Sequence, residues 1–99
     1  EESCGPIIGS QKVSGDAQAV QVVNDTRYGL TAGVYTPDEA RARAVLSQVN
    51  AGSGYWNRSD RVSPRLPRSG HGDSGVGLTL STYGIETFTR PKAWHLRAV

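Results

Sequence analysis

The stretch Thr31-Ala-Gly-Val-Tyr-Thr-Pro-Asp-Glu-Ala-Arg-Ala-Arg-Ala-Val-Leu-Ser-Gln-Val-Asn50 decides the fold, because it joins a short strand to the most clearly signalled helix. Its segment Thr36-Pro-Asp-Glu39 has the form of a capping box with proline at the first helical position. The apolar side chains that follow at helical spacing are Ala42, Val45, Leu46 and Val49. Asn50 and Gly52 are typical of a left-handed helix exit. The sequence therefore predicts a strand over 31–36 and a helix over 37–49.

The segments on either side alternate between strand and helix signals. A strand over 6–13 and a turn precede a helix that Asp16 can cap and that closes near Asn24. A short strand over 53–57 follows the central helix, and the chain ends in an alternating strand over 92–99. Another helix carries one stripe of Leu80, Gly84 and Phe88. Helices between successive strands predict an α/β fold with a mostly parallel sheet and helices that cover both faces.

The segment 58–77 contains prolines and glycines and has no periodicity, so it is predicted to be a long loop. Loops of this length in a compact domain are often functional, which makes this one a candidate site wall. Four arginines fall in its first part, Arg58, Arg61, Arg65 and Arg68, and only Asp60 opposes them. Their charge favours an anionic ligand, although a solvated basic loop gives the same pattern.

The run His71-Gly-Asp-Ser-Gly75 contains the residues that surround the nucleophile of trypsin-like serine proteases. A catalytic serine needs a base and an orienting acid around it. The histidines of the chain are His71, which is too close in sequence to turn back on Ser74, and His95, which lies in an apolar strand pattern. A chain of 99 residues is also too short for a two-barrel protease. The sequence therefore favours a glycine-rich structural loop over a hydrolase site.

The composition of the chain limits its expected partners and cellular compartment. The formal charge is +2, so nucleic acid is not an expected partner, and the single cysteine, Cys4, excludes an intrachain disulfide. The chain has no apolar run of membrane-spanning length and no signal-peptide pattern, so we expect a cytoplasmic protein with no membrane partner. No metal site is predicted. Because methionine is absent even at position 1, we expect a segment of a longer protein.

Four motifs in order resemble the C-terminal portion of the NAD(P)-dependent aldehyde dehydrogenases. They are Glu1-Glu-Ser-Cys-Gly-Pro6 for the family's E-E-x-F-G-P, Asn24-Asp-Thr-Arg-Tyr-Gly-Leu30 with Ala32-Gly-Val-Tyr-Thr36 for N-x-x-x-Y-G-L-x-A-x-V-[FY]-T, Ala51-Gly-Ser-Gly-Tyr-Trp-Asn57 for A-G-T-V-W-V-N, and Pro67-Arg-Ser-Gly-His-Gly-Asp-Ser-Gly-Val-Gly77 for P-F-G-G-x-K-x-S-G-x-G. The resemblance implies that residues 1–91 form the C-terminal part of a catalytic domain and that 92–99 form an oligomerisation strand.

The resemblance also implies which chemistry this chain supplies. In the family, a cysteine forms a thiohemiacetal, hydride passes to the nicotinamide, and a glutamate activates water; both residues precede the matched segment. The chain therefore contains no catalytic residue and is expected to be inactive alone. Glu2 matches the glutamate that binds the ribose of NAD or NADP, and Cys4 stands where a phenylalanine packs near the nicotinamide. Most of the cofactor contacts are expected upstream. Ser74 matches the structural serine of S-G-x-G.

By the same resemblance, the loop 58–77 corresponds to a wall of the aldehyde pocket. Val62 and Arg68 fall where the family places aromatic or apolar pocket residues. Arg68-Ser-Gly70 replaces Phe-Gly-Gly, and arginines suit carboxylate or phosphate groups. We therefore expect an aldehyde with an anionic or strongly polar group, with Arg58, Arg61 and Arg68 as anchors.

The expected partners are the remainder of the parent enzyme and further copies of the same chain, which the C-terminal strand would pair. Alternation alone fits any half-buried strand, so this role depends on the resemblance. An alternative interpretation is a non-catalytic oligomerisation or interaction module that keeps the fold without the chemistry.

Overall fold

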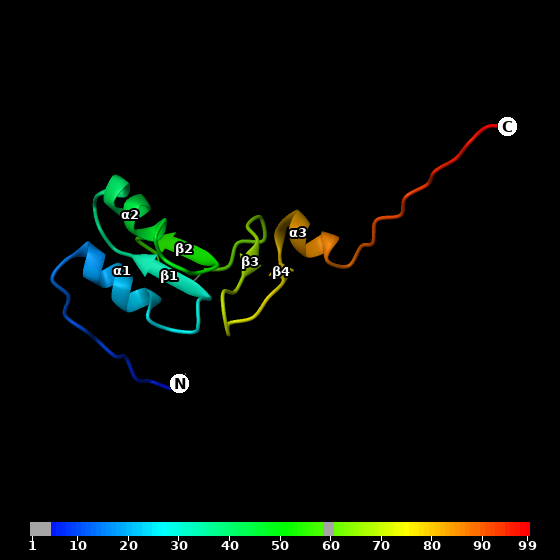
Figure 1. Cartoon of the computed structure of the whole chain (residues 1–99). Helices are drawn as coiled ribbons and strands as arrows, with labels where there is room; N and C mark the ends of the chain where they lie inside the picture. The colour runs from blue at the N-terminus through cyan, green and yellow to red at the C-terminus, as the bar shows by residue number, and fades with distance from the viewer. Residues whose placement is uncertain (1–4, 59–60) are drawn as a thin grey trace.

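The computed structural model describes residues 5–58 and 61–99, and its elements follow one another as Figure 1 shows. They are α1 (Asp16–Asn24), β1 (Thr31–Val34), α2 (Glu39–Leu46), β2 (Ser53–Trp56), β3 (Arg68–Ser69), β4 (Leu78–Thr79) and α3 (Ser81–Glu86). β1 and β2 pair in parallel, with Thr31 opposite Ser53, and α2 connects them. The predicted strand-helix-strand unit and the α/β class are therefore confirmed.

The start of α2 differs from the predicted capping box. The N-cap is Asp38, whose Oδ1 accepts a hydrogen bond of 3.1 Å from the backbone N of Arg41. Thr36 instead accepts a hydrogen bond from the backbone N of Asp38 through its Oγ1, at 3.2 Å. A carboxylate nearer the first turn satisfies the free N–H groups better than the hydroxyl two residues earlier. The helix therefore begins at Glu39 rather than at Pro37.

The end of α2 also differs from the prediction. The C-cap is Ser47 with φ −65°, an ordinary right-handed conformation, and Gly52 is not among the residues with positive φ. Short-range hydrogen bonds from Gln48 to Val45 and from Val49 to Leu46 close the helix instead. The predicted left-handed exit is therefore wrong, because a right-handed turn already pairs the last carbonyls.

The helix α1 has the predicted bounds but a different use for Asp16. Its N-cap is Gly15, which makes no side-chain cap. The Asp16 carboxylate accepts two hydrogen bonds from the Arg41 guanidinium, at 2.8 and 2.6 Å. This pair lowers the pKa of Asp16 and raises the pKa of Arg41. Asp16 therefore ties α1 to α2 rather than capping its own helix.

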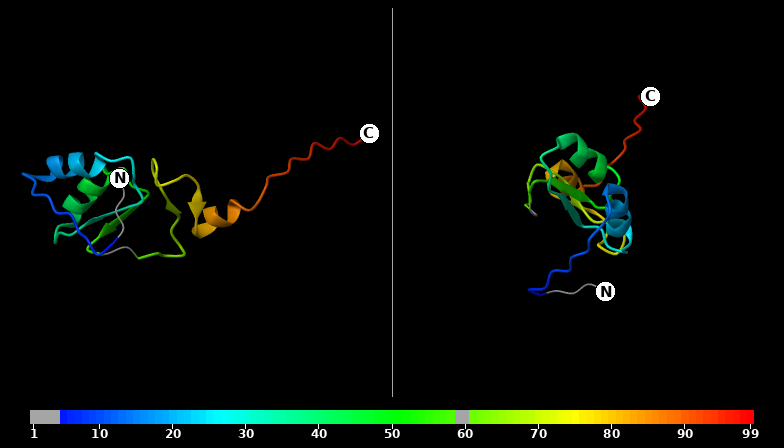
Figure 2. Two further views of the ribbon diagram at one scale, coloured as in Figure 1. Left: turned by 90° about the horizontal axis from the view of Figure 1, so that it is seen from below. Right: turned by 90° about the vertical axis from the view of Figure 1, so that its left-hand side faces the viewer.

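Different elements cover the two faces of the β1–β2 pair. A Cβ placed on Gly54 would lie 3.3 Å from Leu46 of α2, and Figure 2 shows α1 and α2 on one side of the strands. A Cβ placed on Gly33, which points to the opposite face, would lie 3.6 Å from the carbonyl oxygen of Arg58. Within residues 5–58 and 61–99, the predicted helices on both faces are therefore not found. Helices cover one face, and the segment after β2 crosses the other.

Two predicted strands are not strands in the structure, and one predicted loop contains a strand. Residues 6–13 form no strand with the described part of the chain, and Ile7 and Ile8 are 80% and 95% exposed. Residues 92–99 run away from the body without a strand partner in the described part of the chain (Figure 1). Conversely, β3 lies inside the predicted loop 58–77 and pairs with β4. A strand needs a partner for its backbone groups, and alternation in sequence does not supply one.

The chain exposes far more surface than a self-contained domain of its mass. Its accessible surface is 8702 Å², against about 5,500 Å² for a folded monomer of 10.6 kDa. Its radius of gyration is 18.6 Å, against about 12.6 Å for a compact domain of this length. Among the described apolar residues only Ala42 is fully buried. The apolar faces are therefore available for packing against other protein.

None of the helices in residues 5–58 and 61–99 has the length and apolar character needed to cross a membrane.

Candidate functional site

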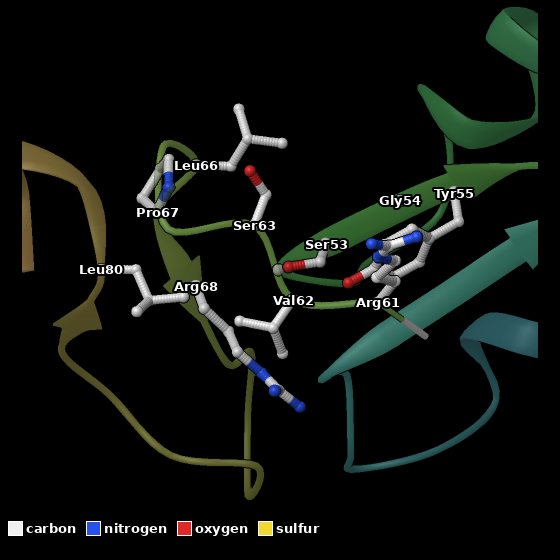
Figure 3. Close-up of a pocket in the computed structure, with 11 residues that line it drawn as sticks. Ser53, Gly54, Tyr55, Arg61, Val62, Ser63, Leu66, Pro67, Arg68 and Leu80 are labelled. Carbon is white, nitrogen blue, oxygen red and sulfur yellow. The ribbon is translucent and has the colours of Figure 1, made fainter. Parts of the chain in front are cut away.

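A groove lies between β2, the segment 61–68 and the turn that leads into α3 (Figure 3). Its volume is about 210 Å³. The residues that line it are Gly52, Ser53, Gly54, Tyr55, Arg61, Val62, Ser63, Leu66, Pro67, Arg68 and Leu80. An adjoining hollow shares part of this lining and adds Arg58. Three predicted pocket residues, Arg61, Val62 and Arg68, therefore share one groove, and Arg58 lines its neighbour.

The residue Asn57 fixes the direction in which the chain enters this groove. It has φ +49°, a left-handed conformation that asparagine tolerates better than most residues. Its side chain accepts a hydrogen bond from the backbone N of Thr36 at 2.9 Å and donates to the Thr36 carbonyl at 2.8 Å. The Trp56 indole donates to the same carbonyl at 2.8 Å. The end of β2 is thereby held to the end of β1 where the arginine segment begins.

The other side of the groove is set by the short antiparallel pair. Arg68 lies opposite Thr79 in the β3–β4 register, and Thr79 donates a hydrogen bond to the Arg68 carbonyl at 3.4 Å. Leu80 follows β4 with φ +65° and lines the groove. Figure 3 shows Val62 projecting from the loop toward the Arg68 side chain. Residues from two distant parts of the sequence therefore meet at this groove.

The lining combines positive charge with apolar surface. Arg61 and Arg68 supply guanidinium groups, whereas Val62, Leu66 and Leu80 supply apolar surface. The described lining contains no acidic side chain, histidine or cysteine. It therefore offers no nucleophile with an adjacent base, and it is suited to binding a small ligand that has an apolar part and an anionic part.

Residues 71–75, which include Ser74, are bound to residues 27–29 by hydrogen bonds and an ion pair, and this arrangement is named the clamp. The Ser74 Oγ accepts a hydrogen bond of 2.9 Å from the backbone N of Gly29, and the backbone N of His71 donates to the Gly29 carbonyl at 3.0 Å. Asp73 pairs with Arg27, with Oδ2 to Nε at 3.2 Å. Because the serine and the aspartate bind separate groups of the segment before β1, they do not form a catalytic chain. The geometry agrees with the predicted structural role of Ser74.

The glycine at position 72 allows this clamp to close. Gly72 has φ +58°, and a Cβ there would collide with the carbonyl oxygen of Arg27. Gly72 forms an antiparallel bridge with Tyr28, and the backbone N of Asp73 donates to the Arg27 carbonyl at 2.7 Å. The two backbones are too close for a side chain between them.

Several groove residues were not predicted from the sequence. Tyr55 follows the period-two pattern of β2, but the sequence does not show that residues 61–64 and Leu66 lie beside it and form the other wall of the hollow. Leu80 was predicted on a helix stripe, whereas it is the N-cap position before α3. The predicted cofactor residues Glu2 and Cys4 lie outside the described residues, so their roles stay predictions. Within the described residues, no three His, Cys, Asp or Glu side chains gather in a way that could hold a metal ion.

Sequence comparison decides the family. Residues 1–94 match the sequence profile of the Aldehyde dehydrogenase family. The chain belongs to this family. It is 35% identical over 97 residues to an aldehyde dehydrogenase of Aspergillus niger, a match that covers 98% of this chain and 20% of that protein. It is 35% identical over 92 residues to the NADP/NAD-dependent aldehyde dehydrogenase PuuC of Escherichia coli, which covers 93% of this chain and 19% of that protein.

Solved structures of aldehyde dehydrogenases share the fold. Betaine aldehyde dehydrogenase of Staphylococcus aureus, solved in complex with NAD⁺, aligns with a TM-score of 0.82 and 27% identity over 85% of this chain and 17% of that chain. Succinic semialdehyde dehydrogenase of Streptococcus pyogenes, in complex with NADP⁺, aligns with a TM-score of 0.74 and 33% identity over 77% of this chain and 17% of that chain. The chain spans about one fifth of the length of the curated aldehyde dehydrogenases that it matches.

Proposed function

We propose that this chain acts as a segment of an NAD(P)-dependent aldehyde dehydrogenase that oxidises an aldehyde to a carboxylic acid. Its contribution is one wall of the aldehyde pocket, formed by the segment 58–77. The observation that carries the proposal is the convergence of Arg61, Val62 and Arg68 on one groove in a chain that belongs to this family.

The cofactor of the proposed enzyme is NAD or NADP, which accepts the hydride from the aldehyde carbon. Related enzymes from Staphylococcus aureus and Streptococcus pyogenes have been solved with NAD⁺ and NADP⁺ respectively, which supports this class of cofactor. Glu2 is the proposed ribose ligand, since its carboxylate can accept two hydroxyl hydrogen bonds. Cys4 is proposed to lie near the nicotinamide. The remainder of the enzyme would make most cofactor contacts.

The described residues position the substrate rather than react with it. The groove lining has no nucleophile–base pair, and Ser74 is bound to the backbone of Gly29. The clamp at Gly72 and the Asn57 contacts hold the two ends of the 58–77 segment. We therefore expect the chain alone to form no thioester and to oxidise no aldehyde.

The proposed partners are the remainder of the enzyme and further copies of the chain. Trp94 and Leu96 in the segment 92–99 are 69% and 81% exposed. They would share one face of a strand, and no strand in residues 5–58 or 61–91 pairs with this segment. This exposed tail also favours a second candidate function, a non-catalytic oligomerisation or interaction module.

NAD(P)H formation by the complete protein, with a panel of aldehydes, separates the two candidates. The proposal expects turnover by the complete protein and none by residues 1–99 alone. A complete protein that assembles through residues 92–99 and oxidises no aldehyde would instead support the interaction module.

A further inference from the structure

Arginines supply the charged groups in the described lining of the groove. Four arginines lie between positions 58 and 68, against a single acid, Asp60, which is outside the described residues. Arg58, Arg61 and Arg68 line the groove or the adjoining hollow, and the described lining of both contains no acidic side chain. The guanidinium groups of this lining can attract a small anion that enters the groove.

Three other arginines of the described chain form ion pairs with acidic residues. Their ion pairs are Arg27–Asp73, Arg41–Asp16 and Arg43–Glu39. None of these six residues lines the groove or the adjoining hollow. These three ion pairs therefore contribute no acidic side chain to the described lining of the groove.

The groove by itself has a small volume. Its volume of about 210 Å³ is below the roughly 300–1,000 Å³ of pockets that hold drug-sized molecules. Val62, Leu66 and Leu80 give it an apolar part beside the guanidinium groups. A short carbon chain with a terminal anion matches both parts, since guanidinium binds carboxylate and phosphate by paired, charge-assisted hydrogen bonds.

We propose that Arg61 and Arg68 bind the anionic group of a short-chain aldehyde substrate, a carboxylate or a phosphate at the end distant from the carbonyl. This inference depends on the proposed function, because it assigns the substrate class of the same pocket wall. Arg58 strengthens the attraction from the adjoining hollow. Val62 contacts the carbon chain between the anion and the carbonyl.

The test compares paired aldehydes in the complete enzyme. One pair is butanal and 4-oxobutanoate, and the other is glyceraldehyde and glyceraldehyde 3-phosphate, so the two pairs distinguish carboxylate from phosphate. The variants are Arg61→Gln and Arg68→Gln, each also made as lysine. Arg65→Gln is the matched control, because it removes the same charge from the same loop but Arg65 lines neither hollow.

The expected result is a preference of the wild-type enzyme for the anionic member of one pair. Each groove substitution should lower the ratio of kcat/KM between the anionic and the neutral aldehyde by about 10- to 100-fold, mainly through KM. Lysine should restore part of that ratio, because it keeps the charge but not the fork geometry. Arg65→Gln should change the ratio by no more than about threefold, the size of a screened surface charge effect.

An enzyme that oxidises butanal as well as 4-oxobutanoate, and glyceraldehyde as well as its phosphate, would overturn this inference and leave the proposed function intact. So would groove variants whose ratios equal that of Arg65→Gln. If Arg68→Gln fails to fold because it disturbs β3, Arg61→Gln in the neighbouring loop decides the matter. A complete enzyme that oxidises other aldehydes of the panel but neither anionic aldehyde would also overturn this inference alone. A complete enzyme that oxidises no aldehyde of the panel would overturn the proposed function itself.

Discussion

Replacing Gly72 by alanine should open the clamp between the segment 70–75 and the residues before β1. Alanine in the left-handed conformation at φ +58° costs about 1–2 kcal/mol. Its Cβ would also collide with the carbonyl oxygen of Arg27, a backbone atom that cannot rotate away. Separating these two segments breaks the 2.7 Å hydrogen bond from the backbone N of Asp73 to the Arg27 carbonyl, which contributes about 1 kcal/mol. Local opening should therefore become easier by about 2–3 kcal/mol.

Hydrogen exchange of the amides in 70–75, measured in the complete enzyme, gives the free energy of this local opening directly. Gly72→Ala should accelerate exchange there by about 30- to 150-fold. Gly72→Asn, which tolerates the left-handed conformation but keeps a Cβ, should recover only part of the loss. Gly9→Ala is the control, because nothing lies within 4 Å of its Cβ position and its φ is ordinary. Unchanged exchange in Gly72→Ala, or full recovery by asparagine, would refute the collision with Arg27.

Three further predictions concern the clamp, the helix pair and the exposed surface. Ser74→Ala should leave the Gly29 N–H without its 2.9 Å partner and cost about 1–2 kcal/mol, seen as a lower urea midpoint. A fluorophosphonate probe should not label Ser74, and labelling would restore the hydrolase interpretation. Because the Arg41 guanidinium lowers the pKa of Asp16 from its ordinary 3.8, the tie between α1 and α2 should be fully present above about pH 4 and lost as pH falls through the lowered value. Asp16→Asn should remove this pH dependence of exchange in α1, and an identical acid profile in the variant would contradict it. The chain alone should associate in sedimentation experiments as its concentration rises, since its apolar faces are uncovered; a rigid monomer at all concentrations would be the opposite result.

Local signals in the sequence were sufficient for the central unit. The proline, the acidic residues after it and the apolar spacing of α2 are all short-range features, so the βαβ unit was predicted correctly. The N-cap residue of α2 could not be predicted in this way, because Thr36 and Asp38 are both good capping residues. The path of the backbone decides which of them binds the first turn.

Pairing between distant segments could not be predicted in the same way. β3 and β4 contain two residues each and have no periodicity, so their pairing depends on the clamp and the turn that follows. Residues 6–13 carry a strand pattern but have no partner in the described chain. The groove was predicted through Arg61, Val62 and Arg68, whereas Leu80 reaches it only because β4 returns to β3.

The central claim is that the arginine-lined groove and the cofactor ribose border one chamber. A crystal structure of the complete enzyme with NAD⁺ and succinate, the carboxylate product of 4-oxobutanoate, tests it most directly. We predict the guanidinium groups of Arg61 and Arg68 at about 2.7–3.2 Å from one succinate carboxylate, and the Glu2 carboxylate on the ribose in the same cleft. Succinate bound elsewhere, or a groove and Glu2 on opposite sides of the molecule, would contradict the claim.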